Sequence, residues 1–163
     1  IFPVLNAIFQ RIYGESPYKS PTDMGVNMAG NCICDDEACR EASRQEIIRR
    51  YNEALATYRT QTLNHLDGDH VSSGHLYLVR LLDKSIEQRN EIIIKMAERG
   101  IACNVHYKPL PMMTAYKALG FDIADYPNAY NQYHNEITLP LHTSLTDEDV
   151  EYVISNFVDI ISQ

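Results

Sequence analysis

The sequence of 163 residues has no tryptophan, no long apolar run and no dense patch of lysine and arginine. A helix that crosses a bilayer needs roughly 20 consecutive apolar residues, so we expect none here. The net charge is −8. Binding to nucleic acid or to an anionic membrane depends on cations that neutralise phosphates, and we therefore expect neither partner. No basic start precedes an apolar signal segment, which favours a cytoplasmic location.

The sequence also lacks the short motifs that mark common enzyme sites. There is no dinucleotide-binding glycine motif, no P-loop, no nucleophile elbow and no H-E-x-x-H pair among the six histidines. His106 and His142 each lie at the end of a predicted strand, where ligand sites often form in α/β layouts. For His142 the favoured interpretation is a partly buried side chain bonded to backbone. The residues alone thus predict an α/β domain with a ligand loop at 104–111.

Three of the four cysteines, Cys32, Cys34 and Cys39, lie within eight residues. A structural zinc site usually needs four ligands, often as paired C-x-x-C units. Here the spacings are C-x-C and C-x4-C, and the nearest histidine, His65, lies beyond a predicted helix. A redox C-x-x-C is absent as well. We therefore interpret Cys32 and Cys34 as small packing residues and Cys39 as a helix residue, and we predict no metal site.

Apolar periodicity predicts several helices. A short one is expected at residues 2–13, and a long one starts at residue 35 or 36. The long helix carries one apolar stripe, formed by Ile47, Ile48, Tyr51, Leu55 and Tyr58. Two more helices begin at capping boxes, one at Ser85 with Gln88 and one at Thr146 with Asp149. Short helices are expected near 113–120 and 126–135, and residues 64–74 read as a polar loop.

Strands are predicted at residues 75–82, 101–107 and 136–142. The first two flank a helix of about four turns, which is long enough to connect parallel strands, so they predict a β-α-β unit. The expected fold is a two-layer α+β domain with a small sheet of about three strands. Helices would cover one face, and the long helix would lead into the sheet.

From about residue 47 onward, the motifs "RRYNEAL", "SSGHLYLVRL", "CNVHYKPLPMMTAY" and "NEITLPLHTSLTDEDV" follow one another in a characteristic order. This part resembles the smaller, C-terminal domain of the DegT/DnrJ/StrS family of sugar aminotransferases. The third motif is similar to the family's HY-x-PLH loop, although Pro111 stands where the family usually has a second histidine. A role for that histidine is therefore not transferred to this chain.

The resemblance implies a pyridoxal phosphate (PLP) enzyme that acts on nucleotide-linked keto sugars, as in polysaccharide biosynthesis. His106, Tyr107 and Lys108 are the implied substrate-binding residues. Family members hold PLP on a lysine of a larger N-terminal domain, within a Ser- and Gly-rich motif. That context is missing around Lys19, Lys84, Lys95, Lys108 and Lys117. We thus expect no catalytic residue, no cofactor bound by this chain alone and no activity by itself. Self-association through apolar surface is also expected.

The first part of the chain resembles a different family. "YKSPTDMGVNMAG" and the acidic stretch after it are similar to a large, uncharacterised bacterial family. The prediction is an extension of separate origin at 1–46 and an aminotransferase-like domain at 47–163, joined within one helix as a chimera or recombined fragment. Two alternatives stay open: a noncatalytic ligand-binding or assembly module, and a function that belongs to the N-terminal family.

Overall fold

The structure, a computed structural model, describes residues 37–68 and 70–163. The predicted helix at 2–13 and the residues Cys32 and Cys34 lie outside the described residues, whereas Cys39 lies on the first described helix. The α-helices are α2 (Glu37–Leu55), α3 (Ile86–Glu98), α4 (Thr114–Ala118), α5 (Pro127–Tyr133) and α6 (Asp147–Ile161). Two short 3-10 helices, η2 (Leu110–Met112) and η3 (Ile123–Asp125), accompany α4 and α5.

The main sheet has three strands in the order β1 (Thr60–Thr62), β4 (Tyr77–Leu81) and β5 (Glu136–Leu139), and both pairings are antiparallel. Val79 in the central strand pairs with Thr62 on one side and with Ile137 on the other. The predicted α+β class and the small sheet of three strands are thereby confirmed.

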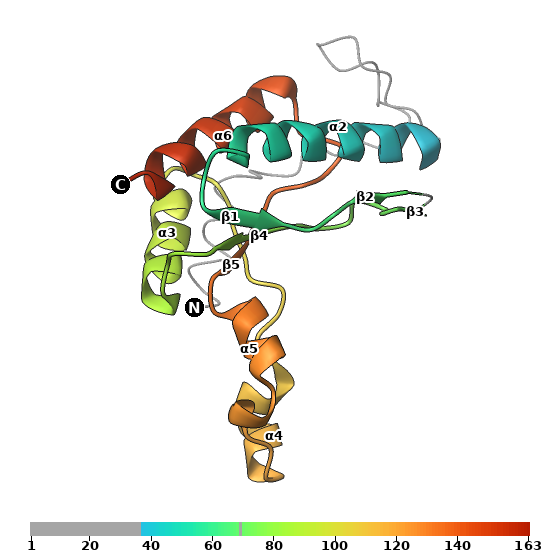
Figure 1. Cartoon of the computed structure of the whole chain (residues 1–163). Helices are drawn as coiled ribbons and strands as arrows, with labels where there is room; N and C mark the ends of the chain where they lie inside the picture. The colour runs from blue at the N-terminus through green and yellow to red at the C-terminus, as the bar shows by residue number, and fades with distance from the viewer. Residues whose placement is uncertain (1–36, 69) are drawn as a thin grey trace, which may run out of the picture.

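The hydrophobic core lies between the sheet and its helices. Helices α2 and α6 run along one face of the sheet, and α3 packs against α6 and β5 at its side (Figure 1). The most deeply buried apolar side chains come from all of these elements: Ile48, Tyr51, Tyr77, Val79, Leu81, Met96, Ile137, Val150 and Phe157. Each contributes about 1.5–3 kcal/mol by its removal from water. None of the helices in the described part of the chain combines the length and hydropathy that a bilayer crossing requires.

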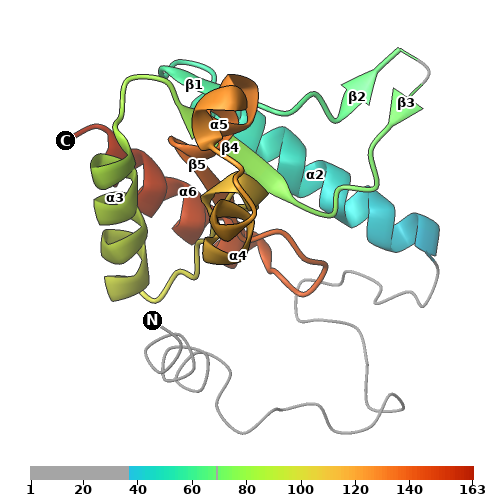
Figure 2. The same cartoon turned by 90° about the horizontal axis from the view of Figure 1, so that it is seen from below.

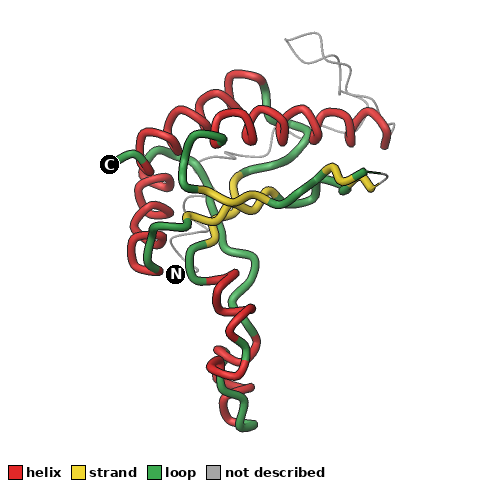
Figure 3. Tube along the Cα trace, viewed as in Figure 1, coloured by secondary structure: helices red, strands yellow, loops and turns green. Residues whose placement is uncertain are grey.

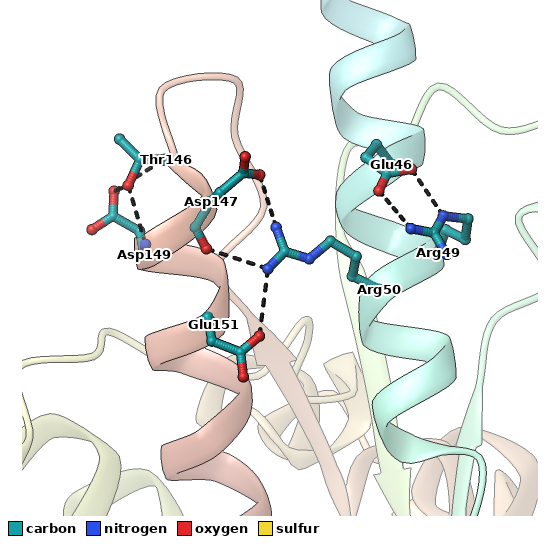
Figure 4. A network of polar contacts seen from close by, with 7 residues as sticks. All are labelled: Glu46, Arg49, Arg50, Thr146, Asp147, Asp149 and Glu151. Carbon is teal, nitrogen blue, oxygen red and sulfur yellow. Dashed lines mark hydrogen bonds and ion pairs between the residues drawn. The ribbon is translucent and has the colours of Figure 1, made fainter. Parts of the chain in front are cut away.

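Helices α2 and α6 are also joined by polar contacts at their exposed edge (Figure 4). The Arg50 guanidinium donates to the Asp147 carboxylate at 2.9 Å and lies 3.5 Å from Glu151. Arg49, by contrast, pairs with Glu46 on its own helix. Because the acidic partners are solvent-exposed, each pair stabilises the fold by at most about 1 kcal/mol.

Both predicted capping boxes form. Ser85 accepts a hydrogen bond from the Gln88 backbone N–H, and the Gln88 side-chain oxygen accepts one from the Ser85 backbone N–H. Thr146 and Asp149 do the same at the start of α6. Gly100 adopts φ +77° directly after α3, in the left-handed region that ends helices and that glycine enters without steric cost.

Residues 108–134, which we call the arm, project away from the opposite face of the sheet (Figure 1), and α4 and α5 overlie the sheet in the view from below (Figure 2). The arm contains only short helices and loops, with no strand (Figure 3). No side chain between 104 and 134 is buried. Several large apolar side chains of the arm are exposed, namely Leu110, Met113, Leu119, Phe121, Tyr126 and Tyr130.

The predicted parallel β-α-β unit is wrong. Residues 101–107 form no strand, and their one ladder contact is an isolated antiparallel bridge between Asn104 and Thr138. The Asn104 side chain accepts from the Val105 N–H, and the backbone N–H of His106 donates to the Glu136 carboxylate. Side chains thus take the donors that a continuous strand would have offered to its neighbour.

The expectation of an irregular loop at 64–74 also needs correction. This stretch contains a small two-stranded antiparallel sheet of β2 (Leu66–Asp67) and β3 (His70–Val71). Gly68 follows β2 with φ +54°, a conformation that suits a tight reversal. A further strand, β1, directly follows α2 and was not predicted as a strand.

Candidate functional site

The candidate site begins at His106, where the chain leaves the edge of the sheet. Its backbone N–H donates to Glu136 Oε2 at 3.0 Å, and its ring Nδ1 lies 2.8 Å from Thr138 Oγ1. The peptide bond to Tyr107 is cis, and the two rings meet edge to face with centroids 4.6 Å apart. Strand β5 therefore holds His106 at both its backbone and its ring.

Glu136 and Thr138 occupy alternate positions of β5, so their side chains leave the same face of the sheet. Glu136 is only 1% exposed, and its Oε1 accepts from the Thr138 hydroxyl at 2.6 Å. Burial raises the pKa of Glu136 above its usual range, while the bonds from Thr138 and His106 and the charge of Arg89 act in the opposite direction. A buried carboxyl thus lies directly behind the predicted substrate residue.

Tyr107 and Lys108 follow His106 into solvent. Tyr107 is 73% exposed and Lys108 is exposed as well. Pro109 holds φ at −55° and leads into η2. The three residues predicted as substrate contacts therefore form one short loop, with its base fixed by β5 and its polar tips open to a ligand. Whether they bind a substrate stays a prediction.

A hollow of about 510 Å³ lies on the α2 side, lined by Arg44, Ser73, His75, Leu141, His142 and Thr143. His75, which lines this hollow, acts electrostatically on the His106 ring. Burial lowers the pKa of His106 below its usual range, and the charge of His75 lowers it further. The neutral form of the His106 ring is thereby favoured near neutral pH. His142 is half-buried, as predicted, and burial lowers its pKa, with Asp149 opposing.

Sequence patterns missed His65, which is 5% exposed. Its ring stacks on Tyr77 with centroids 6.0 Å apart, and its Nδ1 lies 2.9 Å from Ser72 Oγ. Burial lowers the pKa of His65. Its Nε2 has no hydrogen-bond partner. The hairpin that packs His65 against Tyr77 was itself read as a loop, so no sequence signal pointed to this burial.

The described residues do not fit a resident metal or PLP. No group of three metal-ligating side chains occurs among them. A Schiff-base lysine needs a pocket that lowers its pKa and a cradle for the phosphate. Lys95, Lys108 and Lys117 are exposed, and Lys84 is half-buried beside an open hollow. No step of a PLP reaction is therefore assigned to these lysines.

The N-terminal part is similar to a separate group of proteins. The sequence profile of the N-terminal domain of unknown function DUF1846 matches residues 1–73. The UPF0371 protein cu0538 of Corynebacterium urealyticum is 44% identical over 108 residues, which cover 63% of this chain and 21% of that protein. The UPF0371 protein DIP2346 of Corynebacterium diphtheriae is 72% identical over 54 residues, or 33% of this chain and 11% of that one. The chain thus spans about a fifth of these relatives or less.

The described fold is similar to solved aminotransferases. The apo form of Spr1654 of Streptococcus pneumoniae, which is assigned as a sugar aminotransferase, matches this chain with a TM-score of 0.75 and 48% identity. The match covers 77% of this chain and 32% of Spr1654. It has also been solved with PLP. Helicobacter pylori PseC, an aminotransferase in the biosynthesis of pseudoaminic acid, matches with a TM-score of 0.68 and 28% identity, over 76% of this chain and 33% of that one.

The chain therefore spans about a third of these aminotransferases, and its described fold corresponds to that third. The sequence profile of the DegT/DnrJ/EryC1/StrS aminotransferases matches residues 38–158, which include α2, the sheet, the His106 loop and most of α6. This match covers well over half of the sequence, and the chain belongs to the DegT/DnrJ/EryC1/StrS aminotransferase family.

Proposed function

We propose that residues 47–163 act as the small domain of a PLP-dependent nucleotide-sugar aminotransferase and form one side of its substrate cleft. The observation that carries this proposal is the loop His106–Lys108, which is fixed at its base by β5 and open at its tip. An imidazole, a phenol and an ammonium group are suited to sugar hydroxyls and phosphate oxygens. The similarity to Spr1654, which has been solved with PLP, supports the same assignment.

The Schiff-base lysine and the phosphate cradle would belong to a larger domain outside residues 47–163. In that arrangement the chain binds and orients substrate but does not transaminate by itself. Incubation with PLP, followed by borohydride reduction and mass spectrometry, tests this part. No lysine adduct above that of a denatured control is expected. A stoichiometric adduct at one lysine would contradict it.

Substrate binding is tested on the chain by an NMR titration with UDP-glucose, with UDP and glucose separately to identify the part recognised. We expect amide shifts centred on 106–108. Lys108→Met should weaken binding about tenfold or more, since a hydrogen bond to a charged group contributes about 1.5–3 kcal/mol. Lys117→Met, which alters another exposed lysine of the arm, is the matched control. Equal effects of both variants, or shifts elsewhere, would refute the role of the loop.

A noncatalytic assembly module is the second candidate, and the exposed apolar side chains of the arm favour it. Contiguous apolar surface often marks a protein interface. If the arm pairs with a second copy of the chain, sedimentation should show a dimer that Leu119→Glu converts to monomer, because Leu119 is 74% exposed and near the arm's tip. A monomer at all concentrations would remove this candidate.

We also propose that the chain joins two segments of separate origin, 1–46 and 47–163, within α2. The two matching profiles overlap at residues 38–73, a range that contains all of this helix except Glu37. A join inside a helix costs little, because the helical periodicity continues through it. One uninterrupted gene across the junction, read from genomic DNA in a single molecule, would establish a natural fusion. Two separate genes would identify the join as a recombined product.

A further inference from the structure

The buried carboxyl of Glu136 contacts His106 by two routes. Directly, Oε2 accepts the His106 backbone N–H at 3.0 Å. Indirectly, Oε1 accepts the Thr138 hydroxyl at 2.6 Å, and Thr138 Oγ1 lies 2.8 Å from His106 Nδ1. A carboxylate that is ionised can only accept, so both of its partners must donate.

The direction of the bond from Thr138 decides the state of the His106 ring. A hydroxyl has one proton to donate, and Thr138 uses it toward Glu136. Its oxygen must then accept at the other contact, which requires a proton on His106 Nδ1. A neutral imidazole carries one proton, so Nε2 is left with a free lone pair.

The opposite side of the ring has a longer contact that agrees with this tautomer. Asn104 Oδ1 accepts the Val105 backbone N–H at 2.8 Å, which fixes the orientation of this amide. Its NH2 group therefore faces His106, with Nδ2 3.5 Å from Nε2. A donor placed at this nitrogen agrees with an unprotonated Nε2.

Burial raises the pKa of Glu136, and the groups that oppose this and favour its ionised form are Thr138, His106 and Arg89. Arg89 is 1% exposed and donates to two backbone carbonyls, of Tyr133 at 3.1 Å and of Glu136 at 3.0 Å. These acceptors are neutral, and a buried guanidinium is stabilised by a nearby negative charge. Among the described residues, Glu136 is the buried carboxyl that can supply it.

We propose that Glu136 is a positioning residue that acts through Thr138 to hold His106 as the Nδ1–H tautomer, so that Nε2 is a hydrogen-bond acceptor from which a ligand donor displaces the long 3.5 Å contact of Asn104. The use of this acceptor rests on the proposed function, whereas the tautomer does not. An unprotonated Nε2 accepts from a sugar hydroxyl or amino group and repels a phosphate oxygen. The two side chains of the loop would therefore contact different parts of the ligand. His106 would accept a hydrogen bond from the sugar, and the exposed ammonium of Lys108 would bind the phosphate.

The tautomer is measured on the free chain by long-range 1H–15N NMR of the histidine rings, which separates protonated from unprotonated nitrogens. His106 should show a protonated Nδ1 in about tenfold excess, the ratio that one retained hydrogen bond supports. His134 is an internal reference. Its Nδ1 lies 2.9 Å from the carbonyl oxygen of Asn131, which can only accept, so His134 must also be Nδ1–H.

Glu136→Gln reverses the prediction without changing the shape of the side chain. The amide must accept the His106 N–H with its oxygen, so its NH2 group donates to Thr138, and the hydroxyl then donates to His106 Nδ1. The proton of His106 should move to Nε2, while His134 remains unchanged and reports that α5 is intact. Thr138→Val should abolish the preference, and Thr138→Ser should restore it.

A wild-type His106 with its proton on Nε2, or a Glu136→Gln variant with an unchanged tautomer, would overturn the proposal. Both results are obtained without ligand, so they are independent of the substrate assignment. With UDP-glucose, a failure to bind would remove the proposed function and leave the tautomer result standing. Where binding is detected, Glu136→Gln should weaken it severalfold through the sugar part and leave the binding of UDP alone unchanged.

Discussion

The body of the domain and the arm differ in what determines their conformations. The body, built from α2, α3, α6 and the three-stranded sheet, contains the buried apolar side chains. The arm, residues 108–134, has none, and its ring-to-ring contacts are local, as between Tyr116 and Phe121 at 5.9 Å. Both regions have well-formed helices, so helix formation by itself does not indicate a core. Regions with few buried contacts open at lower free energy than a core does.

Removal of one large aromatic side chain from each region is the strongest test of this difference. Phe157 on α6 is 1% exposed, and Phe121 in the arm is 42% exposed. Phe157→Ala should lower the free energy of unfolding by about 3–5 kcal/mol, because it leaves a cavity among side chains that cannot close it. Phe121→Ala should change it by about 0.5 kcal/mol or less. Urea denaturation measures both, and equal losses would mean that the arm has a core of its own.

A second pair of variants compares glycines. Gly74 has φ +60°, and a Cβ there would lie 3.1 Å from both Arg44 Cβ and Ile48 Cδ1 on α2. Gly120 in the arm has φ +90°, with nothing within 4 Å of its Cβ position. Gly74→Ala should cost about 2–3 kcal/mol from backbone strain and overpacking, and Gly120→Ala about 1 kcal/mol from strain alone. Thermal denaturation measures both losses of stability. A larger loss for Gly120→Ala than for Gly74→Ala would contradict the close approach of residue 74 to α2.

The smallest expected effect concerns helix caps. Thr146 accepts from the Asp149 N–H at the start of α6, and Asp122 accepts from the Ala124 N–H in the arm at 2.9 Å. Thr146→Ala should destabilise the chain by about 1 kcal/mol, since α6 is part of the cooperative core. Asp122→Ala should leave global stability within a few tenths of a kcal/mol and increase only local hydrogen exchange in η3. A loss of global stability in Asp122→Ala would show that the arm and the body unfold together.

The sequence predicted the elements better than their pairing. Capping residues such as Ser85 and Thr146 act within one turn, so their patterns can be recognised without tertiary information. The apolar runs of β4 and β5 likewise identified buried strands. The direction of the segment after α3 could not be predicted in this way, because a helix of that length can be followed either by a parallel strand or by the irregular segment that the structure shows at residues 101–107. The backbone N–H of His106 bonds to the carboxylate of Glu136, which lies 30 residues later in the sequence, and no local pattern predicts this long-range bond.

The candidate site shows the same limit. His106 and its loop were predicted from a strand end, and the resemblance added Tyr107 and Lys108; the three lie together on one loop. Glu136 was missed because a glutamate at the start of a strand usually points to solvent. Its spacing of two residues from Thr138 was the available signal, since it places both side chains on one face. The burial that makes this spacing important comes from Arg89 and the 104–106 passage, which no local pattern encodes.

Helix α2 is attached to the body by its second half. Ile47, Ile48, Tyr51 and Leu55 enter the core, whereas Arg44 and Gln45 donate hydrogen bonds to the backbone carbonyls of Ser73 and Ser72. We therefore expect that an upstream sequence that reaches residue 47 in helical phase can precede this domain without repacking its core. The second half of α2 packs into the core, and its first half is a helical segment that we expect different upstream sequences to be able to continue.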